Sequence, residues 1–402
     1  MDFINFYKPE IGQEEINEVT ECLKSGWITT GPRVKQFEAD FINYMKAGKH
    51  AVALNSGTAA LHLAVEAMGV RENDVVIIPT ITFAATAEVL RYYNAIPVFI
   101  DCREDDFCMD MDKLEQTLED IFDGRKVPGL PDNHGPVKGI MPVHFSGQAV
   151  DILRCKKIAK KYNLFIIEDC AHCCPSYFKD EDGAWKMVGS TADIACYSFY
   201  ANKTITTGEG GMALTNNDKL AERIRVMSLH GMNNNTRNRF SQNGSWYYEI
   251  SDPGYKYNLT DIAASIGIQQ LKKADSFWEK RRAIAKIYSE ELSGVPGITI
   301  PIEQSNRKHS WHLYIIRVDK DVTGVERQDF IYQLKELNVG ATVHYMPLHL
   351  HPCYRDTFNL KKEDFPVSVR IFEQIVSMPI YPSLTEGQVK YICKAVKKIV
   401  CK

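Results

Sequence analysis

The chain has 402 residues, of which 45% are hydrophobic and 25% charged, and its formal net charge at pH 7 is -3. This length exceeds what one hydrophobic core usually supports, so we expect two domains, and the composition is that of a folded globular protein. Charges of both signs are spread along the chain without a basic block, which argues against a nucleic-acid-binding protein that tracks phosphates.

The N-terminal stretch predicts no export signal. It reads MDFINFYKPEIGQEE, which lacks both a basic region and a long apolar region. The chain nowhere approaches 18 uninterrupted apolar residues, so we also predict no membrane span. The 11 cysteines are an odd number, and several fall within apolar strand or helix patterns. This usage indicates reduced, buried thiols in a cytoplasmic protein rather than a disulfide framework.

Strands and helices alternate from about residue 50 to residue 215. The predicted strands are nearly continuous apolar runs, which is typical of strands buried on both faces of a mostly parallel sheet. They are HAVALN, DVVIIP, AIPVFID, VKGIMPVHF, LFIIED, DIACYSF and GGMALTN, the last of which follows a glycine-rich turn and is free to run differently. The predicted helices among them are TAALHLAVEAMGV, AATAEVLRYYN and DILRCKKIAKKYN. This order predicts a layered α/β domain.

Two segments interrupt the pattern. Residues 104–135 are less regular and contain RKVPGLPDNHGP, a Pro- and Gly-rich stretch that predicts a surface loop. Residues 231–257 are rich in Asn, Gly and aromatic residues and are too long for a routine connection, so we interpret them as mobile or functional.

The remainder predicts a second domain. A long helical pattern, LTDIAASIGIQQLKKADSFWEKRRAIAKIYSEELSG, leads into it. The strands expected there are HLYIIRV and ATVHY, and the helices are VERQDFIYQLKEL and TEGQVKYICKAVKKIV. We therefore expect a large α/β domain over residues 1–255, and a linking helix with a smaller α+β domain over residues 256–402. Residues 1–30 would pack on the small domain or on a partner subunit.

A cluster of thiols follows one predicted strand. CAHCC, at residues 170–174, places three cysteines and a histidine within five positions. Structural zinc sites usually combine two separated ligand pairs, and no matching second pair lies elsewhere in the sequence. Adjacent cysteines on an extended backbone also point to opposite sides. We therefore expect packed cysteines here and no metal site.

Glycines and polar residues gather at the ends of the predicted strands, which is the edge where open α/β sheets bind ligands. NSGTAAL leads from a strand into a helix, where Gly57 permits close approach. Thr58 and the free N–H groups of the first helical turn can then hold a phosphate, although an ordinary helix cap has the same pattern. Asp169 ends the apolar strand LFIIED and is either a helix cap or the partner of a bound cation.

Two further strand ends carry candidate residues. Ser198 and Lys203 flank the end of DIACYSF, and Lys203 is either a solvated lysine or a nucleophilic amine. Phe83, in PTITFAAT, is either a core residue or a ring that stacks on a planar ligand. A phosphate cradle, a buried carboxylate, an aromatic ring and a lysine together describe a pyridoxal phosphate (PLP) site. In such a site the lysine forms a Schiff base and the carboxylate keeps the pyridine nitrogen protonated.

Several motifs in combination resemble one family. They are GWITTGPRVKQFE, ALNSGTAALHLA, PTITFAATAEVL, FIIEDCAH, SFYANKTITTGEGG and PGYKYNLTDIAASIGIQQL. They resemble the DegT/DnrJ/EryC1 family of PLP-dependent sugar aminotransferases, from about residue 5 to the C-terminus. The resemblance implies an aspartate-aminotransferase-like fold (PLP fold type I). It also implies a homodimer and amino transfer to a keto group of a nucleotide-linked sugar.

The resemblance assigns roles to individual positions. Lys203 would be the Schiff-base lysine, and Asp169 would bind the pyridine nitrogen. His172 would lie near the phenolic oxygen of the cofactor, and Phe83 would stack on its ring. The phosphate would be held by Gly57, Thr58 and Ser198.

Other matching positions concern the partner subunit and the sugar. The GYKYN segment resembles a loop that reaches into the partner's site, where many relatives carry Asn, an aromatic residue and Arg. Here Lys256 and Asn258 occupy these places, as in relatives that form 4-amino-arabinose. The segments that would line the sugar-nucleotide site contain Trp27, Thr29, Thr30, His344 and His349.

The sequence therefore predicts a ping-pong aminotransferase. An amino acid, for which we favour glutamate, would donate the amine, and a C4-keto sugar nucleotide would accept it, with a C3-keto sugar as the second choice. A sugar dehydratase of the same family would carry histidine in place of Lys203. A regulatory protein with the same fold could lose Asp169 or Lys203, and both residues are present.

Overall fold

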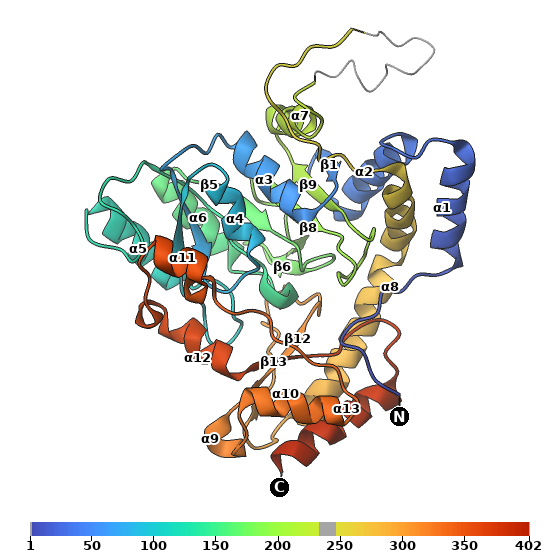
Figure 1. The fold of residues 1–402 in the computed structure, drawn as a ribbon, viewed down its shortest axis with the longest axis vertical. Helices are drawn as coiled ribbons and strands as arrows, with labels where there is room; N and C mark the ends of the chain where they lie inside the picture. The colour runs from blue at the N-terminus through green and yellow to red at the C-terminus, as the bar shows by residue number, and fades with distance from the viewer. Residues whose placement is uncertain (1, 233–246, 402) are drawn as a thin grey trace.

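The computed structural model describes residues 2–232 and 247–401 (Figure 1). Its centre is a seven-stranded sheet in which the strands from β8 to β3 are parallel, whereas β9 is antiparallel to both its neighbours. The order across the sheet is β1 (His50–Leu54), β9 (Gly211–Thr215), β8 (Ile194–Ser198), β5 (Phe165–Asp169), β4 (Val137–Ile140), β2 (Val75–Pro79) and β3 (Ile96–Ile100). The predicted mostly parallel sheet is confirmed, and the strand after the glycine-rich turn does run in the opposite direction.

Alternation along each strand divides the core of the sheet into two clusters, one on each face. In β2, Val75 and Ile77 belong to one cluster, and Val76 and Ile78 belong to the other. The first face is covered by α2 (Pro32–Met45), α5 (Met111–Phe122), α6 (Ile152–Tyr162) and part of α8 (Asp261–Leu292). The second face is covered by α3 (Gly57–Ala67), α4 (Ala85–Arg91) and α7 (Asp218–Met227). Helices therefore cover both faces of the sheet (Figure 1).

Helix α8 joins the sheet to the C-terminal part of the chain. Its first turn is capped by Thr260, whose Oγ1 accepts a hydrogen bond from the N–H of Ala263 at 3.2 Å. It packs against α1 (Gln13–Ser25) and α2 at one end and α13 (Glu386–Val400) at the other (Figure 1). No helix in the described ranges is both long and apolar enough to cross a membrane.

The C-terminal part has its own hydrophobic cluster. Ile4 belongs to this cluster, and its backbone exchanges 2.8 Å hydrogen bonds with Asn338 and Gly340. The elements around it are β10 (Ile298–Thr299), β12 (Tyr314–Val318), β13 (Ile375–Met378), α9 (Lys320–Thr323), α10 (Arg327–Glu336) and α13. A smaller sheet, formed by β11 (Arg307–Lys308), β6 (Tyr177–Lys179) and β7 (Trp185–Met187), connects this part with the segment after β5.

The structure differs from the sequence prediction in several places. The irregular segment 104–135 contains α5, whose N-cap Asp110 accepts hydrogen bonds from two backbone N–H groups of the first turn. The segment ATVHY forms an isolated bridge between Thr342 and Ser377 rather than a strand, because the chain turns into the site described below. Residues 233–246, the middle of the Asn- and aromatic-rich segment, lie outside the described residues.

The chain also crosses back to the large sheet near its C-terminus. Leu348, Tyr354, Leu360 and Phe365 pack in the cluster that covers the α3 and α4 face. The elements of this excursion are η3 (Leu348–Leu350), α11 (Pro352–Thr357), η4 (Lys362–Asp364) and α12 (Pro366–Gln374). The excursion carries His344 and Tyr345 to the edge of the site.

Candidate active site

A cavity of about 480 Å³ lies at the carboxyl ends of β1, β2, β5 and β8. It gathers eight of the residues proposed from the sequence, which are Gly57, Thr58, Phe83, Asp169, His172, Ser198, Lys203 and His344. These residues come from five separate segments of the chain, and strand ends place them at one edge of the sheet. Residues that the strand-end rule singled out therefore share one cavity.

Asp169 and its neighbour Glu168 point to opposite faces of the sheet. Asp169 lies on the α3 and α4 face, where it lines the cavity and is 5% exposed. Its Oδ1 accepts a hydrogen bond from the N–H of Ala171 at 3.1 Å, and its Oδ2 accepts one from Thr86 Oγ1 at 2.9 Å. Burial raises the pKa of Asp169, and these two hydrogen bonds and the charge of Lys203 oppose that rise. The carboxylate is thus an acceptor held ready for a cation.

Lys203 lies in the turn between β8 and β9 and is half-buried. The turn is closed by a 2.9 Å hydrogen bond from its backbone N–H to the carbonyl oxygen of Tyr200. Burial lowers the pKa of Lys203 to about 8, and attraction by Asp169 opposes this decrease. Because the lysine loses solvent and has no close ion pair among the described residues, a larger fraction of its amine than of an ordinary lysine is neutral and nucleophilic near neutral pH.

The N-terminus of α3 approaches the end of β8 and the start of β9 without room for side chains. A Cβ on Gly57 would lie 2.8 Å from Ser198 Cβ, and a Cβ on Gly211 would lie 2.2 Å from the carbonyl oxygen of Ser56. Ser56 is the N-cap of α3, and its Oγ accepts a hydrogen bond from the N–H of Ala59 at 3.0 Å. The glycines therefore permit a cradle in which helix N–H groups and the hydroxyls of Thr58 and Ser198 can surround an anion.

Aromatic rings form the opposite wall. The Phe83 side chain is 60% exposed although it lines the cavity, and its ring lies 5.8 Å from that of Tyr345. His172 is buried, its Nε2 lies 3.4 Å from the Tyr345 hydroxyl, and its Nδ1 has no partner among the described residues. A planar polar ligand bound in this cavity would cover the exposed ring and give the buried nitrogen a partner.

Five other predicted residues lie outside this cavity. Asn258 Nδ2 donates to Thr30 Oγ1 at 2.6 Å, and Lys256 Nζ contacts Asn258 Oδ1. Trp27 Nε1 donates to the carbonyl oxygen of Thr30 at 3.1 Å, and the carbonyl oxygen of Thr29 accepts from the N–H of Asp261. This group borders the edge strand β1, where Asn258 bridges to Leu54.

His349, predicted to bind substrate, is a core residue in this structure. Its side chain is fully buried, its ring lies 4.7 Å from that of Phe365, and it does not line the cavity. Burial lowers the pKa of His349 to about 4. The chain after Tyr345 folds back on the large sheet, which places His349 away from the cavity, and its role toward the substrate stays a prediction.

The sequence interpretation missed several cavity residues. They include Thr82, Tyr200, Asn202, Glu209 and Tyr345. Asn202 Oδ1 is buried without a partner among the described residues. Asn202 and Tyr345 each adjoin a residue that was singled out, so adjacency in the chain was the available signal. A threonine pattern in PTITFAAT was the available signal for Thr82.

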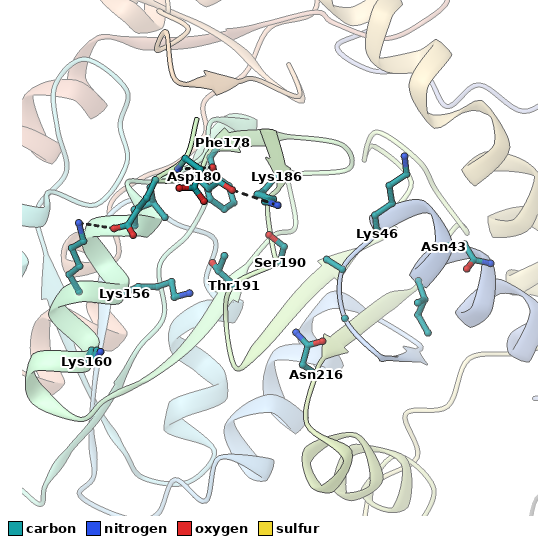
Figure 2. A pocket seen from close by; sticks show the side chains of 17 residues that line it. Asn43, Lys46, Lys156, Lys160, Phe178, Asp180, Lys186, Ser190, Thr191 and Asn216 are labelled. Carbon is teal, nitrogen blue, oxygen red and sulfur yellow. Dashed lines mark hydrogen bonds and ion pairs between the residues drawn. The ribbon is translucent and has the colours of Figure 1, made fainter. Parts of the chain in front are cut away.

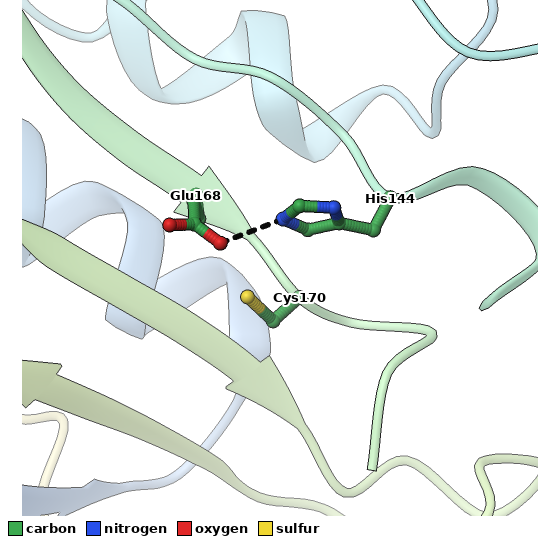
Figure 3. Close-up of side chains that lie close together, drawn as sticks. All are labelled: His144, Glu168 and Cys170. Carbon is green, nitrogen blue, oxygen red and sulfur yellow. Dashed lines mark hydrogen bonds and ion pairs between the residues drawn. The ribbon is translucent and has the colours of Figure 1, made fainter. Parts of the chain in front are cut away.

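A saturated polar group supports β5 from the other face (Figure 3). His144 Nδ1 accepts from the N–H of Val150, so the Nε2 of the neutral ring carries the proton and donates to Glu168 Oε2 at 2.8 Å. Glu168 also accepts from the N–H of Gly189 and the hydroxyl of Thr191. Cys170 adjoins this pair, and burial raises the pKa of its thiol. With these hydrogen bonds already made, the pair of His144 and Glu168 is a structural network.

A second hollow, about 1140 Å³ in volume, lies at the opposite edge of the sheet (Figure 2). Its lining includes Gly48 just before β1, Thr191 just before β8 and Asn216 just after the reversed strand β9. Exposed lysines surround it, and two of them form ion pairs, Lys157 with Glu181 at 2.9 Å and Lys186 with Asp180 at 3.6 Å. None of the residues proposed for the cofactor lines it in the described part of the chain.

The residues of the first cavity fit PLP. Gly57 leaves space for a phosphate, Phe83 presents a ring face, Asp169 can pair with a ring nitrogen, and Lys203 offers an amine. Together with the mostly parallel sheet and the separate C-terminal cluster, they define a PLP-dependent enzyme of the aspartate-aminotransferase fold.

Comparison with known proteins identifies the family. The profile of the DegT/DnrJ/EryC1/StrS aminotransferase family matches residues 9–397. The chain is 43% identical over 398 residues to the uncharacterized protein MJ1066 of Methanocaldococcus jannaschii (99% of this chain and 98% of that protein). It is 41% identical over 399 residues to the spore coat polysaccharide biosynthesis protein SpsC of Bacillus subtilis (99% and 97%).

A solved relative agrees in fold. The sugar aminotransferase Spr1654 of Streptococcus pneumoniae, in its PMP form, superimposes with a TM-score of 0.86 at 31% identity, over 99% of this chain and 98% of that one. The same protein is also solved in a PLP form. The chain belongs to the DegT/DnrJ/EryC1/StrS aminotransferase family and is a PLP-dependent sugar aminotransferase.

Proposed function

We propose that this enzyme transfers the amino group of an amino acid, glutamate, to the C4 keto group of a nucleotide-linked sugar. The observation that carries the proposal is the placement of Lys203 and Asp169 in one cavity with a glycine-lined cradle. The preference for C4 rests on the similarity of GYKYNLTDI to relatives that aminate this carbon. The similarity to SpsC supports a role in polysaccharide biosynthesis.

Lys203 is the proposed proton carrier. When bound, PLP supplies an aldehyde that bonds covalently to amines and a protonated ring that withdraws electrons. The neutral Nζ of Lys203 would accept the proton from the α-carbon of the amino acid and donate it to a carbon of the cofactor within the same half-reaction. With the sugar it would carry a proton in the reverse direction, from that carbon to the carbon that receives the amine. Such positioned proton transfer contributes roughly 10²–10⁴-fold to the rate.

The surrounding residues orient the reacting groups. Asp169 keeps a proton on the ring nitrogen, because an anion at short range favours the charged form of its partner. Thr58, Ser198 and the first N–H groups of α3 hold the phosphate. Phe83 would contact the ring, and His172 Nδ1 would be available to the phenolic oxygen.

A panel of acceptors tests the substrate class. The purified holoenzyme is incubated with glutamate and with UDP-, GDP- and dTDP-linked 4-keto and 3-keto sugars, and the amino sugars are identified by mass spectrometry and NMR. Turnover of a 4-keto sugar supports the proposal, and turnover confined to 3-keto sugars overturns the C4 assignment. A colourless protein that turns over none of them indicates a regulatory role instead.

We also propose a homodimer in which Lys256 and Asn258 reach the phosphate in the site of the partner. Both residues border the edge strand β1, and Lys256 is exposed, so they can extend beyond their own subunit. Within the chain, Lys256 contacts Asn258 and has no carboxylate partner among the described residues. A cationic amine without a carboxylate is suited to a phosphate.

Mixed dimers test the shared site. Lys203→Ala and Lys256→Glu, each nearly inactive alone, are co-expressed with different tags, and the doubly tagged dimers are isolated. One site then carries both lesions and the other neither. Random pairing makes about half of all dimers mixed, so roughly a quarter of wild-type activity should return in the unfractionated mixture. Mixed dimers as inactive as their parents would show that Lys256 serves its own subunit.

We further propose that the enzyme works in the cytoplasm. All 11 cysteines are free, and most of them are buried. Free thiols persist where the surroundings keep them reduced. Fractionation of the source cells with an antibody to the protein tests this placement, and recovery from an extracellular or envelope fraction would contradict it.

A further inference from the structure

A chain of two hydroxyl groups ends on Asp169. Thr86 Oγ1 donates to Asp169 Oδ2 at 2.9 Å, and the Oγ1 atoms of Thr82 and Thr86 lie 2.7 Å apart. Both threonines are buried, and Thr86 has no exposed surface. The N–H of Ala171 donates to the other carboxylate oxygen at 3.1 Å. Each oxygen of Asp169 therefore has one fixed donor, and its remaining lone pairs are available to the cavity that Asp169 lines.

The direction of this chain follows from counting hydrogens. A threonine hydroxyl has one hydrogen, and an ionised carboxylate can only accept. The hydrogen of Thr86 is therefore committed to Asp169, and the hydroxyl of Thr82 must donate to Thr86. Hydrogen bonds in such a chain polarise one another, which strengthens the bond at its charged end. The arrangement favours the ionised carboxylate over the neutral acid.

The hydrogen-bonded hydroxyl groups of Thr82 and Thr86 oppose the effect of burial on the pKa of Asp169. Burial raises the pKa of Asp169, whereas the hydrogen bonds from Ala171 and Thr86 and the charge of Lys203 lower it. The other titratable groups that interact with Asp169 are Tyr345 and the thiols of Cys170, Cys173 and Cys196. Among the groups that lower this pKa, the hydroxyl of Thr86 is the uncharged side chain, so it can be removed without a change of charge.

We propose that Thr86, supported by Thr82, is a positioning residue that orients the carboxylate of Asp169 toward the ring nitrogen of the cofactor. The proposal rests on the assignment of Asp169 to that nitrogen. Geometry also links Thr86 to the aromatic wall, because its N–H donates to the carbonyl oxygen of Phe83 at 3.3 Å. One turn of chain thus sets both the ring that covers the cofactor and the donor that holds its anionic partner.

Three variants test the proposal. Thr86→Val removes the hydroxyl at nearly constant volume, and Thr86→Ser keeps the hydroxyl and removes the methyl group. Thr80→Val is the matched control, because Thr80 is also buried after β2 but its Oγ1 has no partner among the described residues. Melting temperatures of all variants report whether the fold is retained.

The readouts are the affinity for PLP, the pH dependence of the absorbance of the bound cofactor, and the single-turnover rate with glutamate alone. Thr86→Val should weaken PLP affinity and slow the single turnover, together by roughly 10- to 100-fold. It should also lower the pH at which the ring nitrogen of the bound cofactor loses its proton, which is the midpoint read from the absorbance. Thr86→Ser should restore most of these values. Thr80→Val should behave as the wild type in each measurement.

Three outcomes would overturn the proposal. The first is a Thr86→Val protein with the affinity and absorbance midpoint of the wild type. The second is a Thr86→Ser protein as impaired as Thr86→Val, which would assign the effect to packing of the methyl group. The third is an equal effect of Thr80→Val. Asp169→Asn separates the role of Thr86 from the role of Asp169. If neither Thr86→Val nor Asp169→Asn shifts the midpoint, the assignment of Asp169 to the ring nitrogen is wrong. If only Asp169→Asn shifts it, the role of Thr86 alone is refuted.

Discussion

The two hollows of the large sheet lie at opposite edges of it, and Lys203 lines the first, whereas several lysines line the second. Lys203 lies at the carboxyl edge, half-buried in the cavity that Asp169 also lines. The lysines of the second hollow lie at the amino edge (Figure 2). Lys156 and Lys160 are exposed on α6, and Lys157 forms an ion pair with Glu181. Size therefore does not identify the active site.

The pKa values of the two kinds of lysine are shifted in opposite directions. Burial lowers the pKa of Lys203 to about 8, whereas the hydrogen bond with Glu181 raises the pKa of Lys157. A lysine becomes a nucleophile when it loses solvent without gaining a tight anionic partner. The edge of the sheet and the degree of burial, rather than the number of lysines, therefore determine where amine chemistry can occur.

The largest effect is expected from Lys203→Ala. This variant should fold normally and lose transamination by several orders of magnitude, since proton transfer alone contributes roughly 10²–10⁴-fold and the covalent attachment is lost as well. Steady-state assays with glutamate measure the loss, and circular dichroism reports the fold. Turnover near the wild-type rate would place the catalytic amine elsewhere and remove the contrast between the two hollows.

Asp169→Asn should be nearly as damaging at almost unchanged volume. The substitution removes the negative charge that favours a protonated ring nitrogen, so the proton-transfer step should slow by roughly 10²-fold or more while PLP binding weakens modestly. Stopped-flow measurement of the glutamate half-reaction tests this expectation. An unchanged rate would make Asp169 a structural residue, as Glu168 is on the other face of β5.

The pH dependence of amine reactivity measures the difference between Lys203 and Lys157 directly. The neutral fraction of Lys203 should rise as pH increases through about 8, below the ordinary lysine value of 10.5. Lys157 should become reactive only at higher pH, because its ion pair favours the charged form. Competitive labelling of the cofactor-free protein with an amine-specific reagent, read by mass spectrometry, gives both midpoints. A Lys203 midpoint at or above that of Lys157 would contradict the assigned difference.

The smallest effect is expected from substitutions in the second hollow, at the amino edge of the sheet. Lys156→Ala combined with Lys160→Ala should leave turnover and PLP affinity within about twofold of the wild type, because exposed substitutions far from the chemistry usually have small effects. The same assays and a melting curve serve as measurements. A loss comparable with that of Asp169→Asn would show that the amino edge of the sheet contributes to catalysis.

Much of the fold was predictable because the strands are buried on both faces. Runs such as DVVIIP and LFIIED are typical of strands buried on both faces, and their alternation with helical patterns along the chain predicted the layers. Helix α5 escaped prediction because its amphipathic segment lies beside a Pro- and Gly-rich stretch. The segment ATVHY escaped because a short apolar run does not reveal whether it pairs along its length.

The candidate site likewise contains residues that the sequence predicted and contacts that only the structure shows. The sequence predicted that Lys203, Asp169, Phe83 and Gly57 lie together, because each follows a predictable strand and parallel strands bring their carboxyl ends to one edge. Only the tertiary structure decided that Thr86 donates to Asp169 and that Tyr345 joins the wall. It alone placed His349 in the core. These contacts join segments separated by up to hundreds of residues, and their formation depends on helix packing and chain crossings that no local pattern encodes.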